Sequence, residues 1–569
     1  MEECRSKGSR KSAVFFADKA CTLSNNEEVD LFSLCRVLHE NGEHMRAIHI
    51  LRGGMVSAST IKDSWRHWDA SRLLIGRCLA DLDLWEECLE ELGDGDLEDT
   101  SVYNEFDDAD HGAEVSYSSS LSSLGLLRGR AHAALQNVSR ATRCYVASLK
   151  ADPTCVEAFS ALVDGKLLTL EEQVSLLASL EFLPEDSWLK DLYELRVAPE
   201  QAVAERSAQQ ETPTTDFETK FTPRGGHAGA RRDLSGNRDF LCVKARGYEQ
   251  AGSHASALSI TTHLLDRDPY DLAPAETHIA SLVALGRQNE LFLSAHRLIE
   301  AHPEKAIAWY AVGCYYLVAG QSDRARVYFS RATHQHDGHE CAAAWLAFGH
   351  SFAVQDESDQ AMAAYRTASR MFPGYFLPQL CMGMEYARTN NLSLARQYFT
   401  YAENMSPSNP VVQNEAGTLQ FRNGNYAQAL GHFQRALSLY EGQEATLPFR
   451  KGGRGPAAVE GGMAAGYETA LVNLAHCHRK LGRYAEAAAY LEEALGVNAA
   501  CASTHSALAF TQHCLGDIHH AIEGYHRALG LRADDSFAAE MLGRALRDCA
   551  RLSFAVGRPS HTQQQQQHA

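Results

Sequence analysis

The chain has 569 residues, of which 45% are hydrophobic and 22% are charged, and its formal net charge is −19. This is the composition of a core-forming globular chain, and the acidic balance argues against a nucleic-acid or anionic-membrane surface, for which a basic patch is expected. No stretch approaches the roughly 18 consecutive apolar residues of a membrane span. Neither nucleic acid nor a membrane is therefore expected as a partner.

The segment 1–11 is charged and has no apolar core of signal-peptide length, which predicts a protein of the nucleus and cytoplasm. The 15 cysteines include no CxxC pair. In a reducing compartment, cysteines scattered in this way are expected to be small buried hydrophobes rather than disulfide partners.

Residues 1–197 are predicted to form an N-terminal block of degenerate helix pairs. Apolar and small residues at helical spacing indicate pairs that begin near Glu28, Asp69 and Ser122. Between the second and third pairs, residues 93–117 are rich in Asp, Glu and Gly and poor in apolar residues. That composition predicts an acidic loop.

Residues 198–237 lack a helical period and are predicted to be a flexible linker. Thr212 and Thr222 each precede a proline within this segment, so a proline-directed kinase could reach them. A phosphate at either position would add about 1.5–2 negative charges. The sequence leaves open whether either is modified.

The second half of the chain repeats an alanine with a period of about 34 residues, the length of a tetratricopeptide repeat (TPR), which is a pair of antiparallel helices. An aromatic residue follows most of these alanines by four positions, a glycine precedes several of them by twelve, and prolines close several units. The step from Ala257 to Ala325 spans two periods, and an insertion lengthens the step from Ala429 to Ala487. The recurring alanines are Ala257, Ala325, Ala361, Ala395, Ala429, Ala487 and Ala521.

The residue types of this repeat have a steric reason. Small side chains let the two helices of a unit cross closely, and the aromatic ring fills the wedge beside them, because spacings of three and four keep these positions on one helical face. The residues expected to pack in this way are Gly313, Ala325, Phe329, Gly349, Ala361, Tyr365, Gly383, Ala395, Phe399, Gly417, Ala429, Phe433, Ala487, Ala521 and Tyr525.

The predicted fold class is therefore all-α, a TPR superhelix (α-solenoid) of antiparallel helix pairs in two blocks joined by a flexible linker. The C-terminal block covers 238–556, with a loop inserted at 441–466, a closing helix or helix pair from Ser536 to about Val556, and a disordered glutamine-rich tail at 557–569. Its units begin near Arg238, Leu272, Ala306, Ala342, Phe376, Pro410, Glu468 and Ala502.

The inner surface of a TPR superhelix is formed mainly by the first helix of each unit. Apolar, aromatic and amide groups at its positions 5, 9 and 12 suit an extended or helical peptide, with anchors in pockets and polar groups that fix the register. Alternatively, some of these residues simply pack against the next unit. The predicted partner-groove residues are Tyr310, Leu317, Leu346, His350, Leu380, Met384, Asn414, Phe421, Val472, His476, Ser506 and Phe510.

No metal, cofactor or catalytic residue is predicted. His334, His336, His339 and Cys341 have the spacing of metal ligands, but they fall where two units are separated by two extra positions, so a polar turn is favoured. The consecutive residues 476–478 (His-Cys-His) point in different directions on a helix. No GxSxG, P-loop or GxGxxG motif stands at a strand-to-helix junction, and the chain is not expected to be an enzyme.

Several strings are more particular than the repeat. The segments 308–317, 347–354 and 474–481 closely resemble the TPR subunits of the anaphase-promoting complex (cyclosome) known as subunit six or cell division cycle protein sixteen, and Ser12 to Lys19 resembles the opening helix of that family. The chain departs from the family in the 441–466 insertion, the 93–117 loop and the loss of proline at the ends of its last two units.

This resemblance implies a scaffold. In that family two copies associate through their N-terminal repeats, the C-terminal superhelix encloses the N-terminal segment of a small partner subunit, and the dimer stacks with other TPR subunits of a ubiquitin ligase that acts on cell-cycle proteins. The alternative is a TPR co-chaperone or another adaptor. A TPR array fused to a transferase is disfavoured because the segment 536–569 is too short for a catalytic domain.

Overall fold

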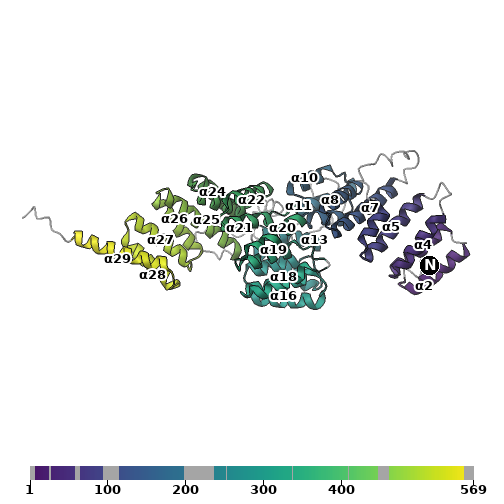
Figure 1. Ribbon diagram of the computed structural model, residues 1–569, viewed down its shortest axis with the longest axis horizontal. Helices are drawn as coiled ribbons and strands as arrows, with labels where there is room; N and C mark the ends of the chain where they lie inside the picture. The colour runs from purple at the N-terminus through teal and green to yellow at the C-terminus, as the bar shows by residue number, and fades with distance from the viewer. Residues whose placement is uncertain are drawn as a thin grey trace, which may run out of the picture. The chain divides into compact units, whose positions relative to one another are not determined.

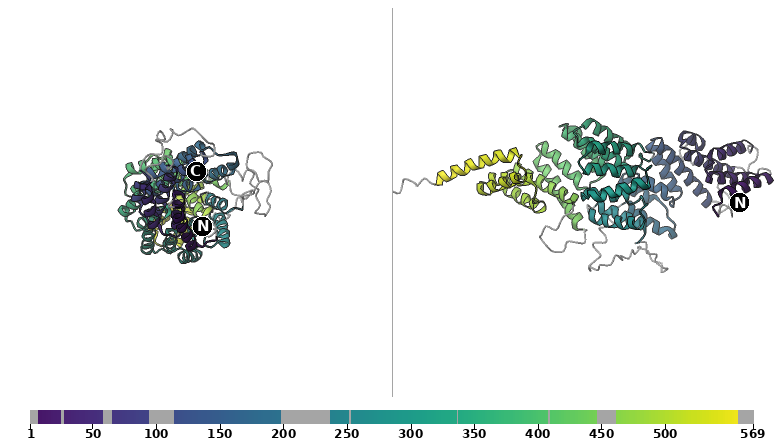
Figure 2. Two further views of the ribbon diagram at one scale, coloured as in Figure 1. Left: turned by 90° about the vertical axis from the view of Figure 1, so that its right-hand side faces the viewer. Right: turned by 90° about the horizontal axis from the view of Figure 1, so that it is seen from below.

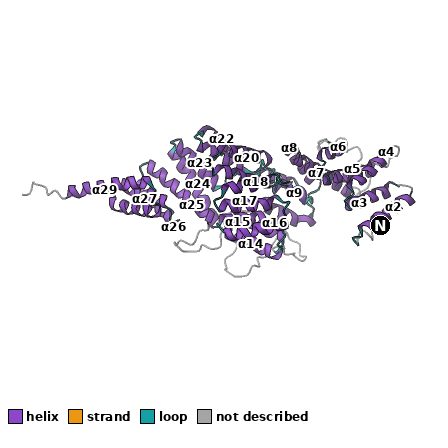
Figure 3. Cartoon of the chain, turned by 60° about the horizontal axis from the view of Figure 1, so that its bottom comes forward, coloured by secondary structure: helices purple, strands orange, loops and turns teal. Residues whose placement is uncertain are grey.

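The computed structural model describes residues 7–24, 27–57, 65–93, 114–197, 236–250, 253–335, 337–407, 409–445 and 461–556. Every regular element within these ranges is a helix, without a strand (Figures 1 and 3). The predicted all-α TPR class is confirmed. Among the helices described, none is both long and apolar enough to cross a membrane.

The chain divides into two units. The first comprises 1–197 with 368–375, and the second comprises 198–367 with 376–569. The segment 368–375 belongs to the first unit through contacts such as the hydrogen bond that the Gly374 N–H donates to the Lys166 carbonyl, 2.9 Å long. Most of the predicted linker, with Thr212 and Thr222, and the tail 557–569 lie outside the described residues.

The helices of the first unit contain the three predicted pairs as α3 with α4, α5 with α6, and α7 with α8. Helix α7 begins at Glu114, so the prediction of a loop was wrong for 114–117, because the sequence from Glu114 to Leu124 has no glycine or proline to stop a helix. The elements are α2 (Arg10–Leu23), α3 (Glu28–Glu40), α4 (His44–Ser57), α5 (Trp65–Asp81), α6 (Trp85–Leu92), α7 (Glu114–Ala134), α8 (Val138–Ala151), α9 (Val156–Val163), α10 (Leu170–Ser179), the 3-10 turn η3 (Pro184–Asp186) and α11 (Ser187–Val197).

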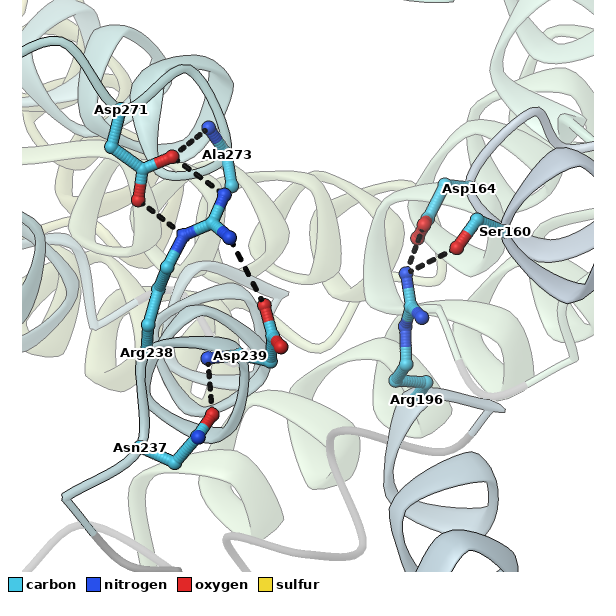
Figure 4. A network of polar contacts seen from close by, with 8 residues as sticks. All are labelled: Ser160, Asp164, Arg196, Asn237, Arg238, Asp239, Asp271 and Ala273. Atoms are coloured by element: carbon cyan, nitrogen blue, oxygen red, sulfur yellow. Dashed lines mark hydrogen bonds and ion pairs between the residues drawn. The ribbon is translucent and has the colours of Figure 1, made fainter. Parts of the chain in front are cut away.

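Two hydrophobic clusters lie among the described residues of the first unit. One joins α2 to α7 around side chains such as Leu38 and Ile75, which are fully buried. The other lies around Tyr193, whose ring stacks on Phe159 with 3.7 Å between the centroids. Arg196 on α11 closes this cluster, because its guanidinium donates to Asp164 and to the Ser160 hydroxyl (Figure 4).

The described helices from 236 onward form eight pairs and the predicted closing helix α29, drawn in yellow beyond α28 in Figure 2. They are α13 (Arg238–Gln250), α14 (His254–Arg267), α15 (Ala275–Ala284), α16 (Gln288–Ala301), α17 (Ala306–Val318), α18 (Ser322–Thr333), α19 (Ala342–Ala353), α20 (Ser358–Met371), α21 (Phe376–Arg388), α22 (Leu392–Met405), α23 (Pro410–Arg422), α24 (Tyr426–Ala445), α25 (Gly461–Lys480), α26 (Tyr484–Val497), α27 (Ala502–Leu515), α28 (Ile518–Leu531) and α29 (Ser536–Val556).

The predicted 441–466 loop is helical at both ends, which corrects its bounds. Helix α24 continues to Ala445 through Glu, Gln and Ala, which favour a helix. Helix α25 begins at Gly461, and Gly466 allows a close approach, because a Cβ there would lie only 2.3 Å from the Tyr440 hydroxyl oxygen. Packing against the preceding helix thus extends α25 ahead of its repeat consensus.

The glycines of the repeat lie directly under aromatic rings. A Cβ on Gly313 would lie 2.4 Å from ring carbons of Phe329, and one on Gly349 would lie 2.3 Å from the ring of Tyr365. Real Cβ atoms do not approach so closely, so only glycine allows each first helix to contact the ring of its second helix. All of the residues predicted to pack in this way are buried.

A charged pair and a polar core group stabilise the first pairs of the second unit. Arg238 at the start of α13 donates two hydrogen bonds, 2.5 and 2.7 Å long, to the carboxylate of Asp271 ahead of α15 (Figure 4). His278 of α15 is buried, with Nδ1 3.0 Å from the Thr261 hydroxyl and Nε2 3.2 Å from the Ser294 hydroxyl. Burial lowers the pKa of His278 to about 4.

Acid should destabilise the chain through this histidine. The pKa of His278 is about 4 in the folded chain and near 6.5 when unfolded, so its stabilising contribution is complete above pH 6.5 and is lost as the pH falls toward 4. Between pH 7 and 5 the loss amounts to about 2 kcal/mol. Thermal unfolding midpoints should fall less over this range for His278→Gln than for the wild type, whereas the exposed His263→Gln should follow the wild type.

Candidate partner-binding surface

The predicted partner-groove residues all lie on the first helices of six successive units: α17, α19, α21, α23, α25 and α27. We call the side chains of these six helices the A-helix surface. Each of the six helices carries two of the predicted residues, and stacked first helices of this kind form the extended surface with which repeat proteins bind a partner.

The residues at the fifth position of each unit are mostly buried inside the chain. Five of the six have exposed fractions of at most 9%, so they contribute to packing and leave little surface for a partner, whereas Val472 is partly exposed. Tyr310 shows the reason, since its ring packs 6.1 Å from that of Phe329 within the same unit. The five are Tyr310, Leu346, Leu380, Asn414 and Ser506.

The remaining predicted residues keep accessible surface. Met384 is 42% exposed, a large value for an apolar side chain on a packed helix. The other six are partly exposed: Leu317, His350, Phe421, Val472, His476 and Phe510. These seven side chains are the part of the predicted set that can contact another molecule.

The two predicted groove histidines, His350 and His476, are uncharged near neutral pH. Burial lowers the pKa of His350, whose Nδ1 lies 2.9 Å from the Tyr365 hydroxyl. Burial lowers the pKa of His476 to about 4. Burial also raises the pKa of the Glu415 carboxyl on α23. Neutral imidazoles beside apolar groups favour recognition of a peptide backbone over recognition of a strongly charged ligand.

An amide pair joins α23 and α25, the first helices on either side of the insertion. Asn473 Nδ2 donates to Asn414 Oδ1 at 3.1 Å, and Asn414 Nδ2 donates to the Glu415 carboxylate at 3.4 Å. Phe433 and Leu474 share one buried cluster across the same junction. The A-helix surface therefore continues across the insertion.

Arg479 of α25 is a candidate partner-binding residue that sequence reasoning missed. Its guanidinium lies over the Phe510 ring, 4.9 Å from the centroid, and burial lowers its pKa. Within the described part of the chain its guanidinium makes no hydrogen bond or ion pair. Arg479 occupies position 12 of its unit, one of the inner positions of a TPR, and that position was the signal that could have found it. A partly buried cation without a carboxylate can bind a carbonyl or carboxylate of a partner.

The two histidine and cysteine groups considered for metal binding do not gather in the structure. His334 Nδ1 bonds back to the Ser330 carbonyl at 2.7 Å, and the described residues of its turn form no ligand cluster; His336 lies outside the described residues. Cys477 is fully buried, whereas its neighbour His476 is partly exposed, so the two diverge as expected for consecutive helical residues.

The chain matches known protein families and a solved structure. The family model described as "Anaphase-promoting complex, cyclosome, subunit 3" matches residues 6–95, and tetratricopeptide repeat models match 310–376, 382–444 and 468–501. Among solved structures, that of the APC/C hetero-tetramer Cut9–Hcn1 matches with a TM-score of 0.71 and 29% identity, covering 96% of this chain and 95% of that one.

Sequence relatives extend along almost the whole chain. Anaphase-promoting complex subunit 6 of Arabidopsis thaliana is 37% identical, covering 96% of this chain and 95% of the relative. Cell division cycle protein 16 homolog of Homo sapiens is 34% identical over 94% of this chain and 81% of its own length. Anaphase-promoting complex subunit cut9 of Schizosaccharomyces pombe is 30% identical, with 95% and 74% covered.

These matches confirm the resemblance seen in the particular strings between the repeat positions, and they extend it to the degenerate N-terminal block. The chain belongs to the family of anaphase-promoting complex TPR subunits that includes subunit 6, cell division cycle protein 16 and cut9.

Proposed function

We propose that this chain is a non-catalytic scaffold subunit of an anaphase-promoting complex (cyclosome)-like E3 ubiquitin ligase and supports the ubiquitination of cell-cycle proteins. The observation that carries the proposal is the match to subunit 6 over 96% of this chain and 95% of the relative. The matched region therefore covers almost the full length of both sequences. The proposed location is the nucleus and cytoplasm.

The proposed mechanism is positional. Cut9 was solved as a hetero-tetramer with Hcn1. By analogy, the A-helix surface holds a segment of a small partner subunit, with Met384 and Phe421 as apolar anchors and Arg479 as a polar one. Two copies of the chain associate through their N-terminal repeats, and the dimer stacks with other TPR subunits.

Purification of the tagged chain from its own cells tests the assignment. Mass spectrometry should recover cullin, RING and other TPR subunits together with a small subunit. Recovery of chaperones without these proteins would instead support the TPR co-chaperone alternative. Light scattering of the full chain should give twice the monomer mass, and a monomer at micromolar concentration would contradict the dimer.

The partner surface has its own test. Met384→Glu places a charge among apolar contacts and should weaken binding of the copurified small subunit at least about 30-fold, which corresponds to a loss of about 2 kcal/mol. Arg479→Ala should weaken binding as well. The matched control is Val327→Glu on α18, where the side chain is 65% exposed on a second helix. Equal affinities of Met384→Glu and Val327→Glu, measured by calorimetry, would contradict the proposed surface.

A further inference from the structure

Four potential metal ligands meet in the first unit, outside the A-helix surface. His39 lies in the last turn of α3, and His44 is the first residue of α4, after a tight turn in which Gly42 has a φ of +84°. Cys78 and Asp81 lie one turn apart at the end of α5. The turn of one helix pair thus faces the first helix of the next.

The ligand atoms are close together. The Nδ1 atoms of His39 and His44 are 3.3 Å apart, and Cys78 Sγ is 3.6 Å from His39 Nδ1. These three ligand atoms all lie within 4.8 Å of one another. One carboxylate oxygen of Asp81 is 3.4 Å from His39 Nδ1 and 3.8 Å from His44 Nδ1.

These separations resemble the edges of a tetrahedral zinc site. With Zn–N near about 2.0 Å and Zn–S near about 2.3 Å, a tetrahedron has edges of about 3.3 Å between two nitrogens and about 3.5 Å between nitrogen and sulfur. The observed 3.3 and 3.6 Å agree with both values. The Asp81 side chain is 49% exposed and can adjust its rotamer to complete the set.

The chemistry of the ligands favours zinc. One thiolate and two imidazoles select zinc over magnesium or calcium, which prefer oxygen. The thiolate and the carboxylate together would neutralise a divalent cation, so no net charge would be added to the partly buried site. The sequence spacing His-x4-His and Cys-x2-Asp also falls within the ranges typical of structural zinc ligands.

We propose that His39, His44, Cys78 and Asp81 bind one structural zinc ion. The ion ties the turn between α3 and α4 to α5 and so joins two successive helix pairs of the degenerate N-terminal block. Four protein ligands leave no open position for a substrate, so the site stabilises the fold rather than catalyses a reaction.

Metal analysis of the full chain tests the proposal. Protein stripped with a chelator, reloaded with zinc and passed through gel filtration should retain about one zinc ion per chain. Reloading with Co²⁺ should give the visible absorption of tetrahedral cobalt and a thiolate-to-cobalt charge-transfer band. Retention of no zinc by the wild-type chain would overturn the proposal.

Matched variants locate the ion. Cys78→Ser should lose the charge-transfer band and the retained zinc, and His44→Ala should lose the zinc. Cys35→Ser removes another fully buried thiol of the same cluster and should keep both signals. Asp81→Asn, which is exposed enough to fold normally, should bind zinc more weakly than the wild type. Equal zinc retention and cobalt spectra in Cys78→Ser and Cys35→Ser would place any metal elsewhere and refute the site.

Stability gives an independent measurement. Chelation should lower the unfolding midpoint of the wild type and of Cys35→Ser but leave that of Cys78→Ser unchanged, because only a bound ion stabilises the folded chain. Circular dichroism of each variant before unfolding establishes that it is folded. A chelator effect of the same size in all three proteins would contradict zinc binding at these residues.

Discussion

Replacing Phe329 by alanine is expected to lower the free energy of unfolding by about 3–5 kcal/mol. The Phe329 side chain is fully buried, and its ring lies directly on Gly313 of the preceding helix. Because glycine has no side chain that could move into the space, the cavity left by the ring would stay open. Denaturant unfolding of the full chain, with hydrogen exchange in α17 to α19 as a local measure, checks the result.

An aromatic residue of the same part of the stack serves as the control for Phe329→Ala. Phe292 on α16 is 48% exposed, so Phe292→Ala should cost less than about 1 kcal/mol. Hydrogen exchange should then accelerate around α17 and α18 only in Phe329→Ala. Equal effects of the two substitutions would contradict the role assigned to the repeat aromatic.

Replacing Gly349 by valine is expected to destabilise the chain by about 3 kcal/mol. Valine is intrinsically a better helix residue than glycine. A loss of stability in Gly349→Val would therefore have to come from packing. The new Cβ would lie 2.3 Å from the ring of Tyr365, whose hydroxyl is held 2.9 Å from His350 Nδ1. The ring therefore cannot retreat without breaking that hydrogen bond.

Gly431 of α24 gives the matched control for Gly349→Val. It is also a helical glycine, but it is exposed and no atom lies within 4 Å of its virtual Cβ. Gly431→Val should change the free energy of unfolding by no more than about 0.5 kcal/mol, and toward greater stability. Parallel denaturant titrations distinguish the two variants. Similar midpoint shifts would show that contact with the Tyr365 ring is not the reason why position 349 requires glycine.

The fold was largely predictable because the repeat is local. Glycine, alanine and aromatic residues at fixed offsets within one repeat define two helices and their crossing, and Gly349, Ala361 and Tyr365 are buried together. The ends of the elements were less predictable. Helix α25 begins at Gly461, ahead of the consensus, since contact between Gly466 and Tyr440 extends it.

The candidate sites depended on contacts between successive helix pairs. The spacing of residues within one repeat does not contain these contacts. Leu380 and Met384 were both predicted to face a partner, yet Leu380 is 2% exposed while Met384, one turn later, is 42% exposed. Both are apolar side chains on α21, and only the neighbouring helices decide which one is covered.

The proposed zinc ligands likewise come together only through contacts between successive helix pairs. Among the described residues, His334, His339 and Cys341, close in sequence, form no three-ligand cluster, whereas His44 and Cys78, a full repeat length apart, lie in one. The sequence by itself determined the helix pairs, the repeat period and the family, because these depend on residues a few positions apart. Tertiary structure alone decided which side chains meet or remain exposed, because stacking brings together residues one whole repeat apart.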